Sequence, residues 1–308
     1  EKSKVGGTCL HVGCIPTKAL LHAAEVADVT RESAKYGVTS TFSGIDIAGV
    51  TAYRQEIIAS KYKGLQGLIK ARGITTIEGE GKLVSPTTVQ VGDETIIGKN
   101  VVLATGSYSR SLPGLEIGGR VITSEQALEL DFVPKKVVVL GGGVIGVEFS
   151  SVWKSWGAEV QIIEALPHLV PNEDESISKQ FERAFRKRGI EFNLGTRFQS
   201  VTQDDNGVVV TLEDGKTFEG ELLLVAVGAL WAALAAAALR SDGSAARLAF
   251  RLNTGDLVVA GPEHPITFRE MEDGVHPYLA VRGGLEALRS EAAKAKPPVL
   301  CGSCRNMD

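Results

Sequence analysis

The amino-acid sequence predicts an α/β fold, and three observations support this class. A β-branched run, Lys136–Leu140, leads through a glycine-rich turn into a helical pattern that ends near Trp156. A further β-rich run, Glu159–Ile163, follows directly, and such alternation of strand and helix is typical of a parallel sheet. Closer to the N-terminus, two long helical patterns precede a series of short β-rich runs. The sequence therefore predicts a chain that mixes helices with a parallel sheet.

Composition limits the size and the partners of this fold. A chain of 308 residues with 44% hydrophobic residues can build two ordinary domains. The net charge is −4 and there is no long basic run, so neither nucleic acid nor an anionic membrane is expected as a partner. No uninterrupted apolar stretch reaches membrane-spanning length, and no secretory signal opens the sequence. Four cysteines in two close pairs predict redox chemistry in a reducing compartment, which makes the cytoplasm the expected location.

Cys9 and Cys14 lie five positions apart beside a predicted helix start. Glycines just before them allow close approach of the backbone to a cofactor, and Pro16 suits the first turn of a helix. Residues 15–36 are predicted to form that helix, which Gly37 ends. Its N-terminus would favour a thiolate at Cys14, because the helix dipole places partial positive charge there. Two buried structural cysteines are the alternative interpretation.

The segment between this helix and the glycine-rich turn is predicted as one long helix followed by short strands and a linker. The helix is expected over Ile45–Arg72. The expected strands are Thr75–Ile77, Thr88–Val91, Thr95–Ile97 and Asn100–Leu103. The last of them runs into Ala104-Thr105-Gly106-Ser107, and the Pro- and Gly-rich residues 111–119 are predicted to be a linker.

The glycine-rich turn, residues 141–146, predicts a dinucleotide site. Gly141 would allow the tight turn, Gly143 the approach of a pyrophosphate, and Gly146 the close packing of helix on strand. Glu164 lies 18 positions after Gly146, near the separation expected for a group that binds an adenosine ribose diol. A glutamate there favours NAD over NADP, whose 2′-phosphate would meet a like charge. A surface glutamate at a strand end is the alternative.

The rest of this region continues the alternation. A helix is predicted over Glu173–Arg188 and a strand over Ile190–Leu194. A β-meander is then expected through Val208–Leu212 to Leu222–Val227, closing at a second strand-to-glycine turn that ends at Gly228.

The cysteine motif, with Gly6-Gly7-Thr8 before it and Ile15-Pro16-Thr17-Lys18 after it, resembles the pyridine nucleotide-disulfide oxidoreductases. The two strand-to-glycine turns fit the same family, and the resemblance extends from residue 1 to about Gly228. Within the family, the Ile-Pro-Thr-Lys ending is most similar to dihydrolipoamide dehydrogenases. The resemblance implies FAD and NAD as cofactors and oxidation of protein-bound dihydrolipoamide with NAD as acceptor. Implied partners are the lipoyl domains of 2-oxoacid dehydrogenase complexes and a second copy of the parent chain.

Two alternatives remain open at this point. One is another disulfide reductase of the same family, similar to mercuric or glutathione reductase, which a second cysteine pair, Cys301 and Cys304, would favour. The other is an inactive fragment that only binds NAD. His264 and His276 precede prolines and are predicted to be turn residues.

The resemblance also implies the roles of the site residues. Cys9 would be the outer cysteine attacked by a dihydrolipoyl thiolate, and Cys14 the inner cysteine nearer the flavin. Lys18 and Glu148 would form an ion pair near the flavin N5. Cofactor contacts are expected from Gly6, Gly7, Thr8, Lys18, Ala104, Thr105, Gly106, Gly141, Gly143, Val144, Ile145, Gly146, Glu148, Glu164 and Gly228. No metal site is expected.

The same resemblance implies how the chain is divided into domains. Residues 1–113 are expected to form an incomplete FAD-binding segment with the redox disulfide, and residues 114–228 a Rossmann-type NAD-binding domain. Residues 229–308, which contain seven alanines between Ala229 and Ala238, form an atypical tail with no predicted fold. We expect a first flavin-binding βαβ unit, of about 30 residues, to precede Glu1 in the parent protein.

Overall fold

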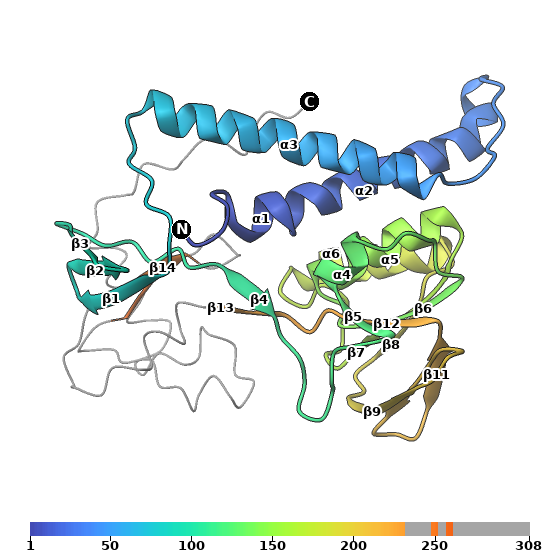
Figure 1. Ribbon diagram of the computed structural model, residues 1–308. Helices are drawn as coiled ribbons and strands as arrows, with labels where there is room; N and C mark the ends of the chain where they lie inside the picture. Colours follow the sequence, from blue (N-terminus) through green and yellow to red (C-terminus); the bar gives the residue numbers. More distant parts are fainter. Residues whose placement is uncertain (232–247, 252–256, 261–308) are drawn as a thin grey trace. The chain divides into compact units, whose positions relative to one another are not determined.

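The computed structural model describes residues 1–231, 248–251 and 257–260 (Figure 1). The chain divides into two compact units, of which the first contains Glu1–Gly81 and Gly106–Trp231. The second contains residues 82–105 and the two described stretches of the tail. His264, His276, Cys301 and Cys304 lie outside the described residues, so the predictions for them stay predictions.

The N-terminal part of the first unit is helical, and its two long helices are α2 (Cys14–Glu32) and α3 (Ile47–Ala71). The short helix α1 (Gly7–His11) precedes α2, and the short 3-10 helix η1 (Ser33–Tyr36) follows it. Both predicted long helices are confirmed. Gly37 ends the first of them with φ 72°, a left-handed conformation that glycine adopts without steric cost. Figure 1 shows α2 and α3 side by side.

A five-stranded sheet forms the centre of the first unit. It contains β5 (Val121–Thr123), β6 (Lys136–Leu140), β7 (Glu159–Glu164), β8 (Glu191–Leu194) and β12 (Leu222–Val225). The order is β5-β12-β6-β7-β8, and every neighbouring pair is parallel. Three helices connect its strands: α4 (Ser124–Leu128), α5 (Val144–Trp156) and α6 (Glu175–Lys187). The predicted α/β class is confirmed.

Each face of this sheet has its own core. On one face Val137 and Val139 pack with Phe149 and Trp153 of α5 and with Leu20 of α2. On the other face the sheet packs against a three-stranded antiparallel meander. The meander consists of β9 (Phe198–Gln203), β10 (Val208–Leu212) and β11 (Thr217–Gly220). Because the helices and the meander cover opposite faces, the central strands are buried on both sides.

One predicted strand in this region pairs with other neighbours than expected. Leu222–Val227 was expected to continue the meander, but Leu222–Val225 forms β12 between β5 and β6 of the parallel sheet. The physical reason is its composition, because four consecutive apolar residues fit a strand that is buried on both faces.

The turn at Gly106 and the turn at Gly228 each lead into a strand of a short antiparallel ladder within the first unit. Strand β4 (Ser107–Ser109) pairs antiparallel with β13 (Ala229–Trp231). The Arg110 N–H also donates to the Gly228 carbonyl at 3.0 Å. The structure therefore brings together the segment that enters the parallel-sheet region and the segment that leaves it.

The second unit contains two small sheets. One is β1 (Gly81–Ser85), β2 (Thr88–Val91) and β3 (Glu94–Ile97), in the order β1-β2-β3. The other pairs β14 (Leu248–Arg251) with β15 (Leu257–Ala260). The strand predicted at Thr88–Val91 is confirmed, and the one predicted at Thr95–Ile97 begins one residue earlier, at Glu94.

Two predicted strands in the segment before Gly106 are wrong. Neither Thr75–Ile77 nor Asn100–Leu103 forms a strand. Val102 is 83% exposed, and none of the described strands pairs with Asn100–Leu103, so its β-branched composition alone does not make it a strand. Within the described part of the chain, none of the helices has the length and apolar character of a membrane span.

Candidate active site

Glycines shape the turn that carries Cys9 and Cys14. Gly6 (φ 111°) precedes α1 and Gly7 (φ 60°) is its first residue, and both lie in a backbone region that other residues rarely adopt. Gly13 precedes α2, and a β-carbon added there would lie 2.9 Å from the Thr8 carbonyl oxygen. These constraints place Cys9 on α1 and Cys14 as the first residue of α2, which confirms the predicted position at the helix start.

Both cysteines are free thiols with exposed positions. The pKa of Cys14 is raised, first by partial burial and then by a hydrogen bond and the charge of Cys9, while Lys18 lowers it. The helix N-terminus that is predicted to favour a thiolate at Cys14 is present, and partial burial together with the neighbouring Cys9 opposes that thiolate.

Lys18 lies one helical turn after Cys14 and contacts Glu148 of α5. Its Nζ forms an ion pair with Glu148 Oε1, as the resemblance implies. The Lys18 side chain is 57% exposed and that of Glu148 19% exposed. The pair thus connects the cysteine-bearing helix with the helix that follows the glycine-rich turn.

Thr8 connects the cysteine turn to the start of β4. Its Oγ1 donates to the Ser107 carbonyl at 3.4 Å, and a β-carbon added at Gly106 would lie 3.8 Å from the same Oγ1. Thr8 and Gly106 therefore lie together, as expected of two cofactor contacts. Ala104 and Thr105 belong to the second unit, so the structure does not place them against this site.

The glycine-rich turn lies between β6 and α5. A β-carbon at Gly141 (φ 112°) would overlap the Ala226 carbonyl oxygen, and one at Gly146 would overlap that of Gly141. These two glycines are therefore required by packing. At Gly143 an added β-carbon would meet nothing within 4 Å, so this residue leaves open space in front of the helix N-terminus. A pyrophosphate fits such a place, because the first N–H groups of a helix have no partner within the helix.

The helix start behind this turn also carries two predicted cofactor contacts. Val144 is the first residue of α5 and is 56% exposed, whereas Ile145 packs against the core. Val144 is therefore available to a ligand, and Ile145 mainly secures the helix. At the far end of the ladder, Gly228 has φ 119° and is exposed.

Glu164 ends β7 beside the glycine-rich turn. Its two carboxylate oxygens accept hydrogen bonds from the Gly142 N–H at 2.7 Å and the Leu166 N–H at 2.8 Å. Each oxygen keeps a further lone pair, so the carboxylate can still accept from a ribose hydroxyl. The geometry fits the predicted diol contact and also ties Glu164 to the turn itself.

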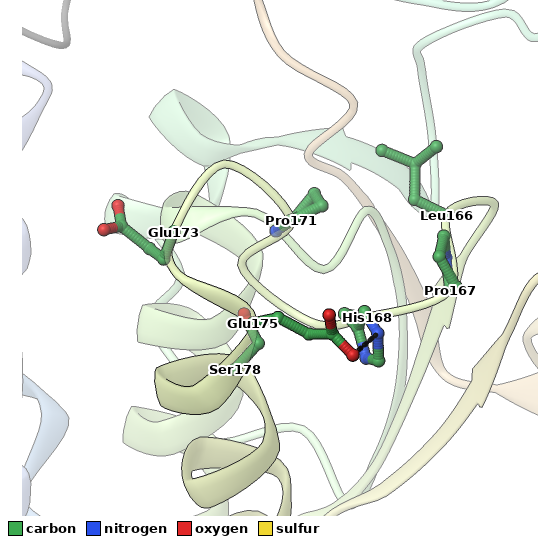
Figure 2. Close-up of a pocket in the computed structure, with 7 residues that line it drawn as sticks. All are labelled: Leu166, Pro167, His168, Pro171, Glu173, Glu175 and Ser178. Carbon is green, nitrogen blue, oxygen red and sulfur yellow. Dashed lines mark ion pairs between the residues drawn. The ribbon is translucent and has the colours of Figure 1, made fainter.

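Sequence reasoning missed a loop that follows Glu164. Residues 166–171, here called the proline loop because Pro167 and Pro171 lie near its ends, border a hollow of about 290 Å³ (Figure 2). The hollow is lined by Leu166, Pro167, His168, Pro171, Glu173, Glu175 and Ser178. His168 lies between Glu175 and the buried Glu182. The sequence offered two signals for this loop. Two prolines follow Glu164 closely, and two polar residues, Ser178 and Glu182, lie four positions apart after them.

Within the described residues, no group of three or more His, Cys, Asp or Glu side chains could hold a metal ion. The cysteine turn, the Lys18–Glu148 pair and the glycine-rich turn all belong to the first unit. That unit therefore contains two neighbouring thiols and a glycine-rich turn with open space at a helix N-terminus.

Comparisons with known proteins agree with this composition of the site. The family model described as pyridine nucleotide-disulphide oxidoreductase matches residues 3–244. A second model, the C-terminal domain of a protein of unknown function (DUF1285), matches residues 232–293. The change of family falls close to Gly228, where the sequence resemblance ends.

Similar proteins include leghemoglobin reductase of Vigna unguiculata, 38% identical over 74% of this chain and 46% of the relative. Mitochondrial dihydrolipoyl dehydrogenase of Pisum sativum is also 38% identical, over 74% of this chain and 48% of its own length. Among solved structures, LpdA of Mycobacterium tuberculosis is 27% identical with a TM-score of 0.66, over 75% of this chain and 52% of that one. The HOCl-induced flavoprotein disulfide reductase RclA of Escherichia coli, as a Cu(II) complex, gives 27% and 0.63, over 75% and 50%. The chain spans about half the length of the curated relatives it matches.

Proposed function

Because the chain belongs to the pyridine nucleotide-disulphide oxidoreductase family, whose members use FAD and NAD(H), we propose that it carries the redox cysteines and the NAD site of a flavin-dependent disulfide oxidoreductase. The proposed substrate is protein-bound dihydrolipoamide, with NAD as acceptor. One observation supports this above all: the cysteine helix α2 and the dinucleotide helix α5 are joined by the Lys18–Glu148 pair.

The proposed chemistry at the cysteines is thiol–disulfide exchange. A dihydrolipoyl thiolate attacks Cys9 Sγ of the Cys9–Cys14 disulfide, which forms a mixed disulfide and releases Cys14 as a thiolate. The second substrate thiolate then attacks the substrate sulfur of the mixed disulfide and releases Cys9. The substrate dithiol is oxidised to a disulfide and the enzyme disulfide is reduced to two thiols, so two electrons move to the protein. Bound FAD and NAD would supply the onward electron and hydride transfer.

The chain's own residues have separate proposed roles. Lys18 stabilises the negative charge left on Cys14, because it already lowers the pKa of that thiol. Glu148 holds the lysine in place. Gly143 leaves room for the pyrophosphate of NAD, and Glu164 accepts from a ribose hydroxyl. Gly6, Gly7, Thr8 and Gly106 are proposed to contact the flavin.

The proposed partners and location follow from the relatives. Dihydrolipoyl dehydrogenases are among the proteins that this chain is similar to, so we propose lipoyl domains of 2-oxoacid dehydrogenase complexes as the source of the substrate. We also propose a homodimer for the parent protein, and the cytoplasm as its location.

The test is dihydrolipoamide-dependent formation of NADH by the 308-residue chain incubated with FAD and NAD, compared with its Cys14→Ser variant. We expect turnover that Cys14→Ser abolishes. A bound-flavin spectrum that gains a long-wavelength thiolate–flavin band on partial reduction would support the same assignment. Turnover that survives in Cys14→Ser contradicts the assigned roles.

A second candidate is an NAD(H)-binding protein without turnover. It is favoured by the raised pKa of Cys14 and by the two hydrophobic cores that pack the opposite faces of the parallel sheet. Saturable binding of NADH together with failure to retain FAD or to form NADH from dihydrolipoamide would decide for this candidate.

A further inference from the structure

Val170 in the proline loop has a strained backbone. Its φ is 45°, and it is the one non-glycine residue with positive φ in the described part of the chain. A β-branched residue rarely adopts this conformation, because its side chain crowds the backbone. Such strain persists only where surrounding contacts hold it, and it is often found beside ligand sites.

The strained residue supports the glycine-rich turn from the side. The Val170 N–H donates to the Gly142 carbonyl at 2.8 Å. The neighbouring Leu169 side chain is fully buried, and its Cδ2 would lie only 2.6 Å from a β-carbon added at Gly142. The backbone of Gly142 is thus held by the proline loop on one side and by the Glu164 carboxylate on the other.

Helix α6 holds the proline loop in place. Glu182 is 6% exposed, and its Oε1 accepts from the Leu169 N–H at 3.2 Å and lies 3.2 Å from His168 Nδ1. One turn earlier, the Ser178 hydroxyl donates to the Val170 carbonyl at 3.2 Å. Residues four apart share a helix face, so both side chains meet the same loop. Figure 2 shows His168 and Glu175 facing each other, and the side chain of Glu175 is exposed.

We propose that Glu182 is a positioning residue for the dinucleotide: by accepting from Leu169 it holds Val170 in its strained conformation and so fixes Gly142 in the turn. Glu182 touches no ligand and acts through the proline loop. The inference rests on the proposed binding of NAD at this turn. A buried carboxylate in this place needs its hydrogen bonds, because a buried charge without partners is costly.

The first test measures NADH affinity of the whole chain by fluorescence titration in three variants. Glu182→Met removes the acceptor and should weaken binding by about tenfold, the factor that corresponds to one lost hydrogen bond to a charged group. Glu182→Gln keeps an oxygen for the Leu169 N–H and should stay within about twofold. Glu175→Met, on the exposed side of His168, is the matched control and should not change the affinity. Unchanged NADH affinity in Glu182→Met, or an equal loss of affinity in Glu182→Met and Glu182→Gln, would overturn the proposal.

The second test asks whether Glu182 acts by holding Val170 in its strained backbone conformation. In the Glu182→Met background, Val170→Gly should restore most of the NADH affinity, because glycine adopts positive φ freely. Val170→Asn keeps a side chain, tolerates the left-handed region better than valine and should restore part of it. A loss that neither change relieves means that Glu182 contributes only general stability.

Urea unfolding separates this inference from the proposed function. Without nucleotide, the drop in the urea midpoint caused by Glu182→Met should shrink to about half in the Val170→Gly background, since coupled residues are not additive. Additive effects overturn the positioning role whatever the chain binds. If the two substitutions show this coupling but the wild-type chain binds no NADH, the result contradicts the proposed NAD site alone.

Discussion

Lys18 of α2 and Glu148 of α5 form an ion pair that joins the cysteine turn to the glycine-rich turn. Lys18 follows Cys14 by four residues, and Glu148 follows Gly146 by two. The same two helices meet again further along, where the Ser155 hydroxyl donates to Asp28 Oδ2 at 2.6 Å. Two polar contacts on one pair of helices fix their register, so the cysteine turn and the glycine-rich turn are positioned together.

The Lys18–Glu148 pair should matter more for turnover than for stability. We expect Lys18→Met and Glu148→Gln each to change the free energy of unfolding by less than about 1 kcal/mol, because the lysine is mostly exposed. Both should strongly reduce the formation of NADH from dihydrolipoamide and NAD. Urea unfolding and steady-state assays measure the two effects, and Glu32→Gln, in an exposed pair with Lys35, is the control. A large loss of stability would show that the pair mainly holds the helices together.

Removing Cys9 should make Cys14 more acidic. The hydrogen bond and the charge of Cys9 both raise the pKa of Cys14, so Cys9→Ala removes both contributions and the pKa falls. The pH midpoint for alkylation of Cys14, read by peptide mass spectrometry after iodoacetamide treatment, should shift to lower pH. Lys18→Met removes the group that lowers this pKa, so its midpoint should shift the other way. Shifts in the same direction for both variants would contradict the assigned causes.

The sequence predicts the first unit well because its signals there are local. The bounds of β6 and the end of α5 at Trp156 coincide with the predicted residues, since an apolar β-branched run and a glycine turn define this segment without help from distant contacts. The pairing of Leu222–Val225 depends on which strands become its neighbours, and Asn100–Leu103 would need a neighbour to become a strand.

At the site, sequence spacing indicated the cysteines and Glu164, and the family resemblance indicated Lys18 and Glu148. It could not indicate Glu182, whose importance depends on folding its helix against the strained Val170. The helix N-terminus at Cys14 could be anticipated from sequence, whereas the partial burial that raises the pKa of this thiol could not.

Gly143 and Gly146 should respond differently to the same change. Gly146→Ala places a methyl group against the Gly141 carbonyl and 3.2 Å from Val139 Cγ1, so we expect it to destabilise the fold by about 1–3 kcal/mol. Gly143→Ala meets no atom within 4 Å and should leave the urea midpoint unchanged. It should nevertheless weaken NADH binding, because the methyl group occupies the space left for the pyrophosphate. NADH affinity that is unaffected in Gly143→Ala would contradict this use of the open space.

Glu164→Gln should reduce the preference for NADH over NADPH. The carboxylate accepts from two backbone N–H groups, and glutamine offers only one oxygen, so one N–H loses its acceptor. We expect NADH affinity to fall by about tenfold. The affinity for NADPH should fall less, because the charge that repels its 2′-phosphate is gone. Fluorescence titrations with both nucleotides measure the ratio, and Glu159→Gln, at the exposed start of the same strand, makes the same charge change away from the turn. An unchanged ratio in Glu164→Gln would mean that another group selects the nucleotide.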